Sequence, residues 1–159
     1  MKRYSLRLLT VAVMAITLAA LLATPVFAAA QWKQVNSRFG AIAGETLATG
    51  NVVAISASDG YAYKADANDS SLRPAVGVIG KGGATGAKVE VVISGILAGM
   101  TAQSPGVRLY LSETPGAITS TAPTNPQVLG WVMPGTAGAA SSTTYFIDVK
   151  VPQSDGPGY

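Results

Sequence analysis

The sequence predicts an all-β protein, a single small barrel or two-sheet sandwich of about eight short strands built from two duplicated halves. Three observations lead to this prediction. The apolar runs of residues 47–151 are short and separated by glycine and proline, none of them shows a sustained 3.6-residue period, and one order of strands and turns occurs twice. Short strands joined by such turns are typical of sandwiches and barrels.

Residues 1–28 read as a secretory signal peptide. A basic start with Lys2, Arg3 and Arg7 precedes an uncharged run at residues 8–23, and Val26-Phe27-Ala28 offers small residues for cleavage. An uncleaved membrane anchor is the alternative, but the run is short for a span of about 20 residues. We therefore expect a protein secreted to the cell surface or the extracellular space, with the periplasm as a further possibility and no membrane contact after cleavage.

Removal of the signal changes the charge of the chain. Three of the 11 Lys and Arg residues lie in residues 1–28, so the eight that remain balance the eight Asp and Glu residues. A nucleic-acid partner is excluded, because it requires a concentrated basic surface. The mature length suits one domain, expected at residues 47–151, and the absence of cysteine excludes disulfide bonds.

The strands are expected in order along this domain. Asn51 to Ser56 is rich in β-branched residues, Asp59-Gly60 is a hairpin-turn signal, and Tyr61 to Lys64 alternates. The further strands are expected at residues 75–79, 88–94, 107–112, 117–121, 128–133 and 144–151.

These strands form two similar halves. When Gly50 is aligned with Gly106, Ile55 falls on Leu111 and Gly60 falls on Gly116. Farther along, residues 75–79 align with 128–132, and residues 88–94 align with 145–151. Neither half could bury its own apolar face, so we expect one common domain in which Ile55 and Leu111 point into a single shared core.

The second half carries a family resemblance. Residues 105–112 (PGVRLYLS), 116–123 (GAITSTAP) and 127–130 (QVLG) resemble the β-barrel modules of tailed-phage structural proteins, of the head-decoration, head-fibre and tail-fibre type. The resemblance covers about residues 47–151 and implies a structural, homo-oligomeric role without catalysis. Virion modules do not normally carry a signal peptide, so this chain is expected to serve a cell-surface or extracellular assembly.

Few residues here carry reactive chemistry. The chain has no histidine and no cysteine, which excludes Cys/His nucleophilic catalysis and the usual zinc sites, and we predict that it is not an enzyme. No cofactor is expected except a possible Ca²⁺ ion, for which Asp66, Asn68 and Asp69 are the candidate oxygen ligands. The alternative for that loop is a solvated Asx turn.

Two further groups of residues suggest contacts with partners. Tyr61, Tyr63 and Tyr110 could form a sugar-stacking face, or could pack across strands as half-buried side chains. Residues 29–46 precede the duplicated unit and carry Trp32, Val35 and Phe39, whose apolar surface should dock. We expect this arm to pair with a neighbouring subunit, with docking on its own domain as the alternative. Residues 152–159 read as a flexible tail.

The sequence therefore predicts a secreted, non-enzymatic structural protein that self-assembles at the cell surface or into an extracellular fibre or lattice. A secreted carbohydrate- or surface-binding module is the alternative.

Overall fold

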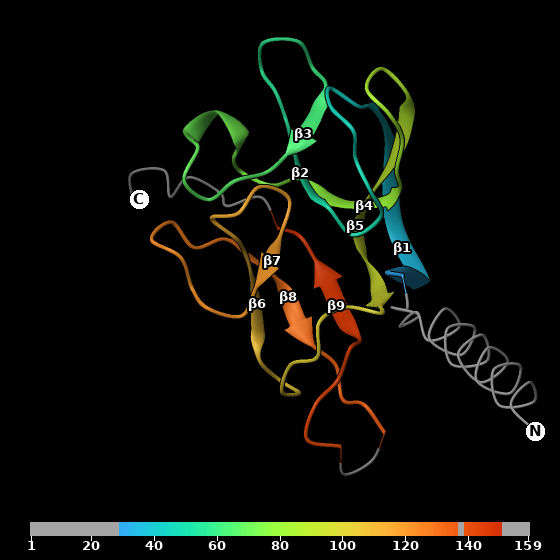
Figure 1. Cartoon of the computed structure of the whole chain (residues 1–159), viewed down its shortest axis with the longest axis vertical. Coiled ribbons are helices and arrows are strands. Elements are labelled where there is room, and N and C mark those ends of the chain that lie inside the picture. Colours follow the sequence, from blue (N-terminus) through green and yellow to red (C-terminus); the bar gives the residue numbers. More distant parts are fainter. Residues whose placement is uncertain (1–28, 137–138, 151–159) are drawn as a thin grey trace, which may run out of the picture.

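The computed structural model describes residues 29–136 and 139–150, so the predicted signal peptide and the predicted tail lie outside the described residues (Figure 1). The predicted all-β class is confirmed. Among the described residues, no helix is long and apolar enough to cross a membrane. The elements are β1 (Gln31–Ile42), β2 (Val52–Ile55), β3 (Ala62–Lys64), a 3₁₀ turn η1 (Ser70–Leu72), β4 (Gly77–Lys81), β5 (Lys88–Ala98), β6 (Arg108–Leu111), β7 (Ile118–Thr119), β8 (Val128–Val132) and β9 (Tyr145–Asp148).

The strands form one antiparallel sheet in the order β3-β2-β4-β5-β9-β8-β6-β7, with β1 paired to β5 outside this path. The order reads as the same unit twice. In the first half, β2 lies between β3 and β4, and β5 follows. In the second half, β6 lies between β7 and β8, and β9 follows. The two halves meet where β5 pairs with β9, near the centre of Figure 1. The duplication predicted from the sequence is therefore a property of the topology.

Backbone hydrogen bonds repeat at equivalent positions. The N–H of Gly50 donates to the carbonyl of Ile79, and the N–H of Gly106 donates to the carbonyl of Val132, at 2.9 and 2.8 Å. Both glycines have positive φ, 90° and 81°. Since glycine adopts this region without a Cβ penalty, the sequence repeats glycine where the turn repeats.

The fourth strands of the two halves, β5 and β9, are equivalent in a different register from the one predicted by the sequence alignment. Ile79 pairs with Val91, and its counterpart Val132 pairs with Tyr145. Val91 is therefore equivalent to Tyr145, whereas the sequence alignment placed Lys88 on Tyr145, three residues away. Both strands are apolar at alternate positions, so the sequence pattern alone did not fix the register, and the cross-strand pairing did.

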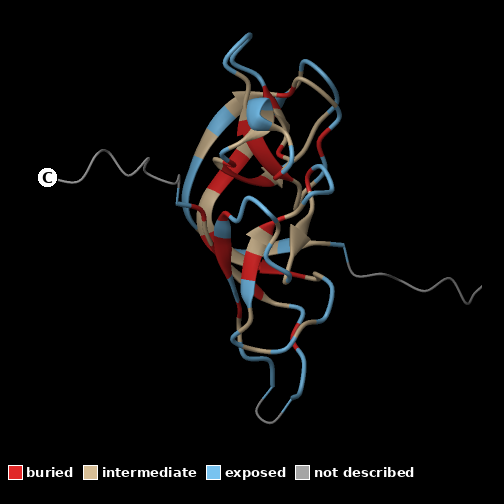
Figure 2. Ribbon diagram, turned by 90° about the vertical axis from the view of Figure 1, so that its left-hand side faces the viewer, coloured by how far each residue is buried: buried red, intermediate tan, exposed pale blue. Residues whose placement is uncertain are grey.

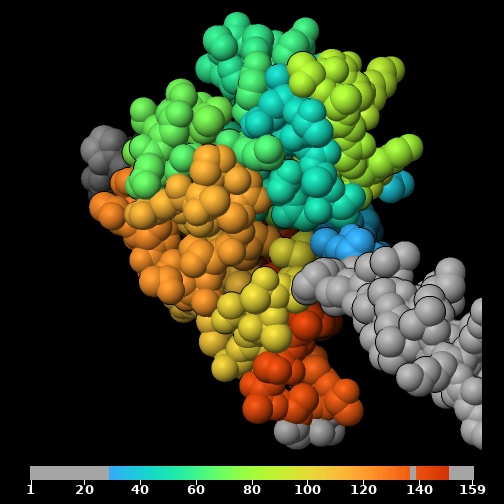
Figure 3. All heavy atoms as spheres, in the orientation of Figure 1, coloured from blue at the N-terminus to red at the C-terminus, as the bar shows by residue number. Residues whose placement is uncertain are grey.

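The sheet curls until its two ends meet at Gly116. The N–H of Gly116 donates to the carbonyl of Ala65 at 2.8 Å, and its carbonyl accepts from the N–H of Val52 at 3.0 Å. The N–H of Ala67 adds a bond of 3.0 Å to the carbonyl of Ser112. Figure 3 shows the orange second half lying against the green segment that follows β3. These bonds hold the curled sheet in a half-barrel shape.

The buried residues, coloured red along the ribbon in Figure 2, form two clusters rather than the single expected core. Leu111 is buried in the larger cluster, which contains residues of both halves. Ile55, at the equivalent position, packs against a smaller cluster built from the first half and the segment after β1. The expectation of one core shared by Ile55 and Leu111 was therefore wrong. The same strand face is covered by different partners in the two halves.

Candidate functional site

The arm that precedes the duplicated unit is a strand of the sheet. β1 pairs antiparallel with β5 along its whole length, from Gln31 opposite Ala98 to Ile42 opposite Lys88. Of the two expectations for this arm, the structure shows the one in which it docks on its own domain. β1 pairs with no other described strand, so its second edge is an open sheet edge.

The predicted docking residues of the arm contact the domain unequally. The indole Nε1 of Trp32 donates to the carbonyl of Ile79 at 3.1 Å, and Trp32 packs against the larger cluster. Phe39 packs against the smaller one. Val35 is half-buried and joins neither cluster, so of the three predicted residues only Trp32 and Phe39 pack against a core cluster.

The three candidate ligand tyrosines lie in different halves. Tyr61 and Tyr63 flank the buried Ala62, and Tyr61 is exposed just before β3. Tyr63 lies within β3 and is half-buried with its ring over Gly44, and its hydroxyl donates to Asp59 Oδ2 at 2.8 Å. A bond from the backbone N–H of Tyr61, and then the bond from Tyr63, hold the pKa of Asp59 below its ordinary value. Tyr110 lies on β6, where it pairs with Thr119 of β7 and with Val128 of β8. Within the described chain, no hydrogen bond joins it to the other two tyrosines.

The candidate Ca²⁺ loop directs its carboxylates to its own backbone. Asp66 Oδ1 accepts from the N–H of Asn68 at 2.8 Å. Asp69 Oδ1 accepts from the hydroxyl and the N–H of Ser71, at 2.7 and 2.8 Å, and caps η1. These bonds lower the pKa of Asp69. This is the geometry of an Asx turn. Among the described residues, no group of three acidic side chains is placed to hold a metal ion.

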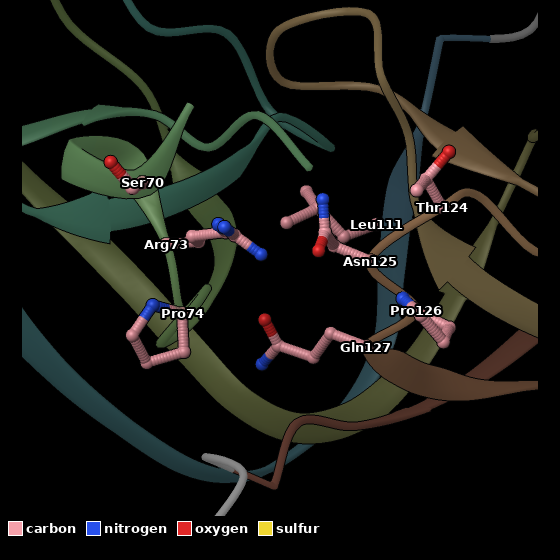
Figure 4. Close-up of a pocket in the computed structure, with 8 residues that line it drawn as sticks. All are labelled: Ser70, Arg73, Pro74, Leu111, Thr124, Asn125, Pro126 and Gln127. Carbon is pink, nitrogen blue, oxygen red and sulfur yellow. The ribbon is translucent and has the colours of Figure 1, made fainter. Parts of the chain in front are cut away.

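A cleft between the halves was not foreseen from the sequence. It has a volume of about 500 Å³ and is lined by Ser70, Arg73, Pro74, Leu111, Thr124, Asn125, Pro126 and Gln127. Figure 4 shows Arg73 and Asn125 pointing toward one another across it. Beneath them, the buried Gln127 bonds to both backbone groups of Ala75. Pro74 and Pro126 mark irregular segments in the sequence, but only folding brings these two loops together.

The second half has an uncovered apolar face. Inward side chains alternate with outward ones on β6 and β9, whereas β8 has two buried residues, Leu129 and Gly130, between the exposed Val128 and Trp131, where the pairing with β6 shifts by one residue. The register sets Arg108 opposite Trp131 and Trp131 opposite Phe146. The rings of Trp131 and Phe146 lie 5.9 Å apart. We call this side of the sheet the outer face, and its members are Arg108, Tyr110, Val128, Trp131, Phe146 and Asp148. Trp131 is 40% exposed and Val128 is 43% exposed.

The equivalent face of the first half is covered. By the repeat register, Val52, Val78 and Val92 correspond to Arg108, Trp131 and Phe146. All three valines are fully buried. Val52 and Val78 belong to the larger cluster, together with the inward residues of the second half. One half thus packs its face on the other, whereas the outer face of the second half has no such cover within the described chain.

Comparison with known proteins identifies no relative of this chain. No protein-family model matches the chain, and no curated protein matches it.

Proposed function

We propose that this protein is a secreted, non-enzymatic structural unit that acts by self-association at the cell surface or in an extracellular fibre or lattice. The observation that carries the proposal is the outer face, where Trp131 and Val128 are exposed although the equivalent positions of the first half are buried. Exposed apolar surface is unfavourable by roughly 25 cal/mol per Å², so a partner that covers it gains stability.

Two other features support the proposal. Without residues 1–28 the chain has equal numbers of acidic and basic residues, and a net charge near zero favours association. The open edge of β1 offers a second surface, since unpaired strand edges are templates for strand addition. Two distinct surfaces on one subunit are what an extended fibre or lattice requires.

The cleft between the halves favours a second candidate function, a carbohydrate- or surface-binding module. Arg73 and Asn125 present hydrogen-bonding groups to a hollow of about 500 Å³, which is within the range of small-ligand sites. In this function the subunit would bind a glycan or another polar ligand without any need to assemble.

Secretion is tested on the full-length chain expressed in a bacterium. N-terminal sequencing of the exported protein should return Ala29 or Gln31, the residues that follow the two cleavage sites. A product that retains Met1 or Lys2 would contradict removal of the signal.

Association is tested on the exported protein. Light scattering over a concentration series, with negative-stain microscopy, should show defined oligomers or fibres. Monomers at every concentration would contradict the proposal. Binding of such monomers on a glycan array, lost in Arg73→Ala, would establish the second function.

A further inference from the structure

We infer that the outer face docks on the outer face of a second copy of this chain, related by a two-fold axis. The inference rests on the proposed function and names the contact that would carry it. It follows from the arrangement of six side chains on β6, β8 and β9.

These side chains form a grid of two rows. Cross-strand pairing gives one row of Arg108, Trp131 and Phe146. In the other row Tyr110 pairs with Val128, and Asp148 lies two residues beyond Phe146 on β9, on the same side of the strand. The apolar centre is Trp131 and Val128. Arg108 and Asp148 stand at opposite corners.

This placement of charge is self-complementary. Consider a two-fold axis that lies in the plane of the contact. If this axis crosses the line from Arg108 to Asp148 at its midpoint and at right angles, it places Arg108 of each copy over Asp148 of the other. Both ion pairs then form at once, as an isologous contact requires. Within the described chain Arg108 forms no ion pair, and Asp148 has only a 3.8 Å contact with the highly exposed Lys150. Such exposed pairs contribute little, so exchange of partners costs little.

The fold leaves room for this contact. A hollow of about 390 Å³ lies on the same face and is lined by Gly106, Arg108, Val128, Gly130, Trp131, Phe146, Asp148 and Lys150. Position 130 has no side chain that could fill this hollow, because a Cβ at Gly130 would collide with the carbonyl of Phe146. The hollow can therefore receive the Trp131 ring of a second copy. Stable contacts between proteins usually have a buried aromatic side chain at the centre and charged residues at the rim.

Comparison of the two halves also supports a contact between two copies at the outer face. In the first half, the equivalent positions carry Val52, Val78 and Val92, which suit permanent burial within the chain. The second half carries Arg108, Trp131 and Phe146 instead. Arginine and aromatic residues are enriched where proteins meet other proteins. At these positions the first half therefore has the composition of an internal core, and the second half has the composition of a contact between molecules.

The test uses charge reversal in the exported chain, followed by sedimentation velocity over a concentration series. Arg108→Glu and Asp148→Arg should each weaken association by about 30-fold or more, because a dimer of either single variant has two like-charge contacts in place of two ion pairs. The double variant R108E/D148R should recover association, since both pairs are restored with reversed polarity. An equimolar mixture of the two single variants should also associate. In a mixed dimer the two introduced side chains have opposite charges and meet at one corner, while the native Arg108–Asp148 pair forms at the other.

Matched controls use residues of the other half. Trp131→Ser should weaken association, whereas Tyr61→Ser, which removes a similarly exposed ring, should not. Lys81→Glu changes charge at an exposed position of β4 without touching the outer face and should leave association unchanged. Circular dichroism and thermal unfolding confirm that each variant is folded.

The outcomes separate this inference from the proposed function. If the wild-type chain associates and all the outer-face variants associate equally well, assembly stands and this contact is overturned. The contact is also overturned if the single variants lose association and neither the double variant nor the mixture recovers it. A monomeric wild-type chain would remove both proposals.

Discussion

The side-chain amide of Gln127 pairs with both backbone groups of Ala75, 52 residues away: Oε1 accepts from the Ala75 N–H at 2.7 Å, and Nε2 donates to the Ala75 carbonyl at 2.8 Å. The amide thereby acts as one rung of a β ladder between the two halves. Nε2 also lies 3.3 Å from the carbonyl of Lys150. Gln127 is almost fully buried, so these bonds form in a medium that penalises any missing partner.

Gln127→Leu should therefore destabilise the domain. It keeps the size of the side chain but leaves the buried N–H and carbonyl of Ala75 without partners, at a cost of about 2 to 4 kcal/mol in the free energy of unfolding. Urea unfolding followed by circular dichroism measures this loss. Gln34→Leu, at an exposed position of β1, is the control and should change stability by less than about 0.5 kcal/mol. Equal stability of the two variants would mean that Gln127 does not join the halves.

The two hairpin glycines offer a matched pair. Gly60 and Gly116 are equivalent in the repeat and share a φ of 74°. Alanine at either position is strained by about 1 to 2 kcal/mol. At Gly60 an added Cβ meets nothing within 4 Å, whereas at Gly116 it would lie 2.9 Å from Lys64 Cγ and disturb the bonds that close the sheet. Gly116→Ala should thus lower the unfolding midpoint clearly more than Gly60→Ala. A larger loss at Gly60 would argue against closure at Gly116.

The arm should be required for folding rather than only for assembly. Trp32→Phe keeps an aromatic ring but removes the bond to the Ile79 carbonyl, and should cost about 1 kcal/mol. Trp32→Ala also removes the ring that lies over Gly95, and should cost about 2 to 4 kcal/mol. Urea unfolding measures both losses, and equal costs would mean that the ring itself adds nothing to stability.

Deletion of residues 29–40 extends this test. It removes most of the strand that covers the edge of β5, so we expect an unfolded or strongly destabilised chain. A deletion variant that remains as stable as the wild type but becomes monomeric would show that the arm acts between subunits in solution.

The Asp59–Tyr63 pair predicts two linked titrations. The Tyr63 hydroxyl donates to Asp59, which raises the pKa of Tyr63 above its ordinary value. The pKa of Asp59 is lowered, mainly by its bond from the Tyr61 N–H and then by Tyr63. The folded state therefore binds fewer protons at Asp59 than the unfolded state, and the stability from this carboxylate is lost as the pH falls through its lowered pKa. The stability from Tyr63 is lost as the pH rises through its raised pKa.

Asp59→Asn should lower the pKa of Tyr63 toward the value of a free tyrosine, because the charged acceptor is gone. Phenolate absorbance measured across alkaline pH reports this change. Asp69→Asn is the control, since Asp69 bonds to Ser71 and not to any tyrosine. A Tyr63 pKa that is the same in Asp59→Asn and in the wild type would exclude the bond.

The all-β class, the approximate position of each strand of the duplicated unit and the duplication itself could all be predicted from the sequence. These features are local, because alternation, turn residues and repeated glycines act over a few residues and leave a readable pattern. The sequence also predicted that Trp32, Val35 and Phe39 dock, since their apolar surface is unfavourable in water, and of these Trp32 and Phe39 pack against the core clusters.

The packing partner of each strand face depends on contacts between residues far apart in the sequence and could not be predicted from it. Ile55 and Leu111 occupy equivalent positions, but the curl of the sheet buries them in different clusters. Likewise, Arg73 and Asn125 come from loops far apart in the sequence and line one cleft because the halves are held together, by Gln127 at Ala75 among other bonds. Trp131 lies in the apolar strand β8, and only the fold places it on the outer face. Strand alternation shows that a side chain lies on one of two faces, and long-range packing determines which face is covered.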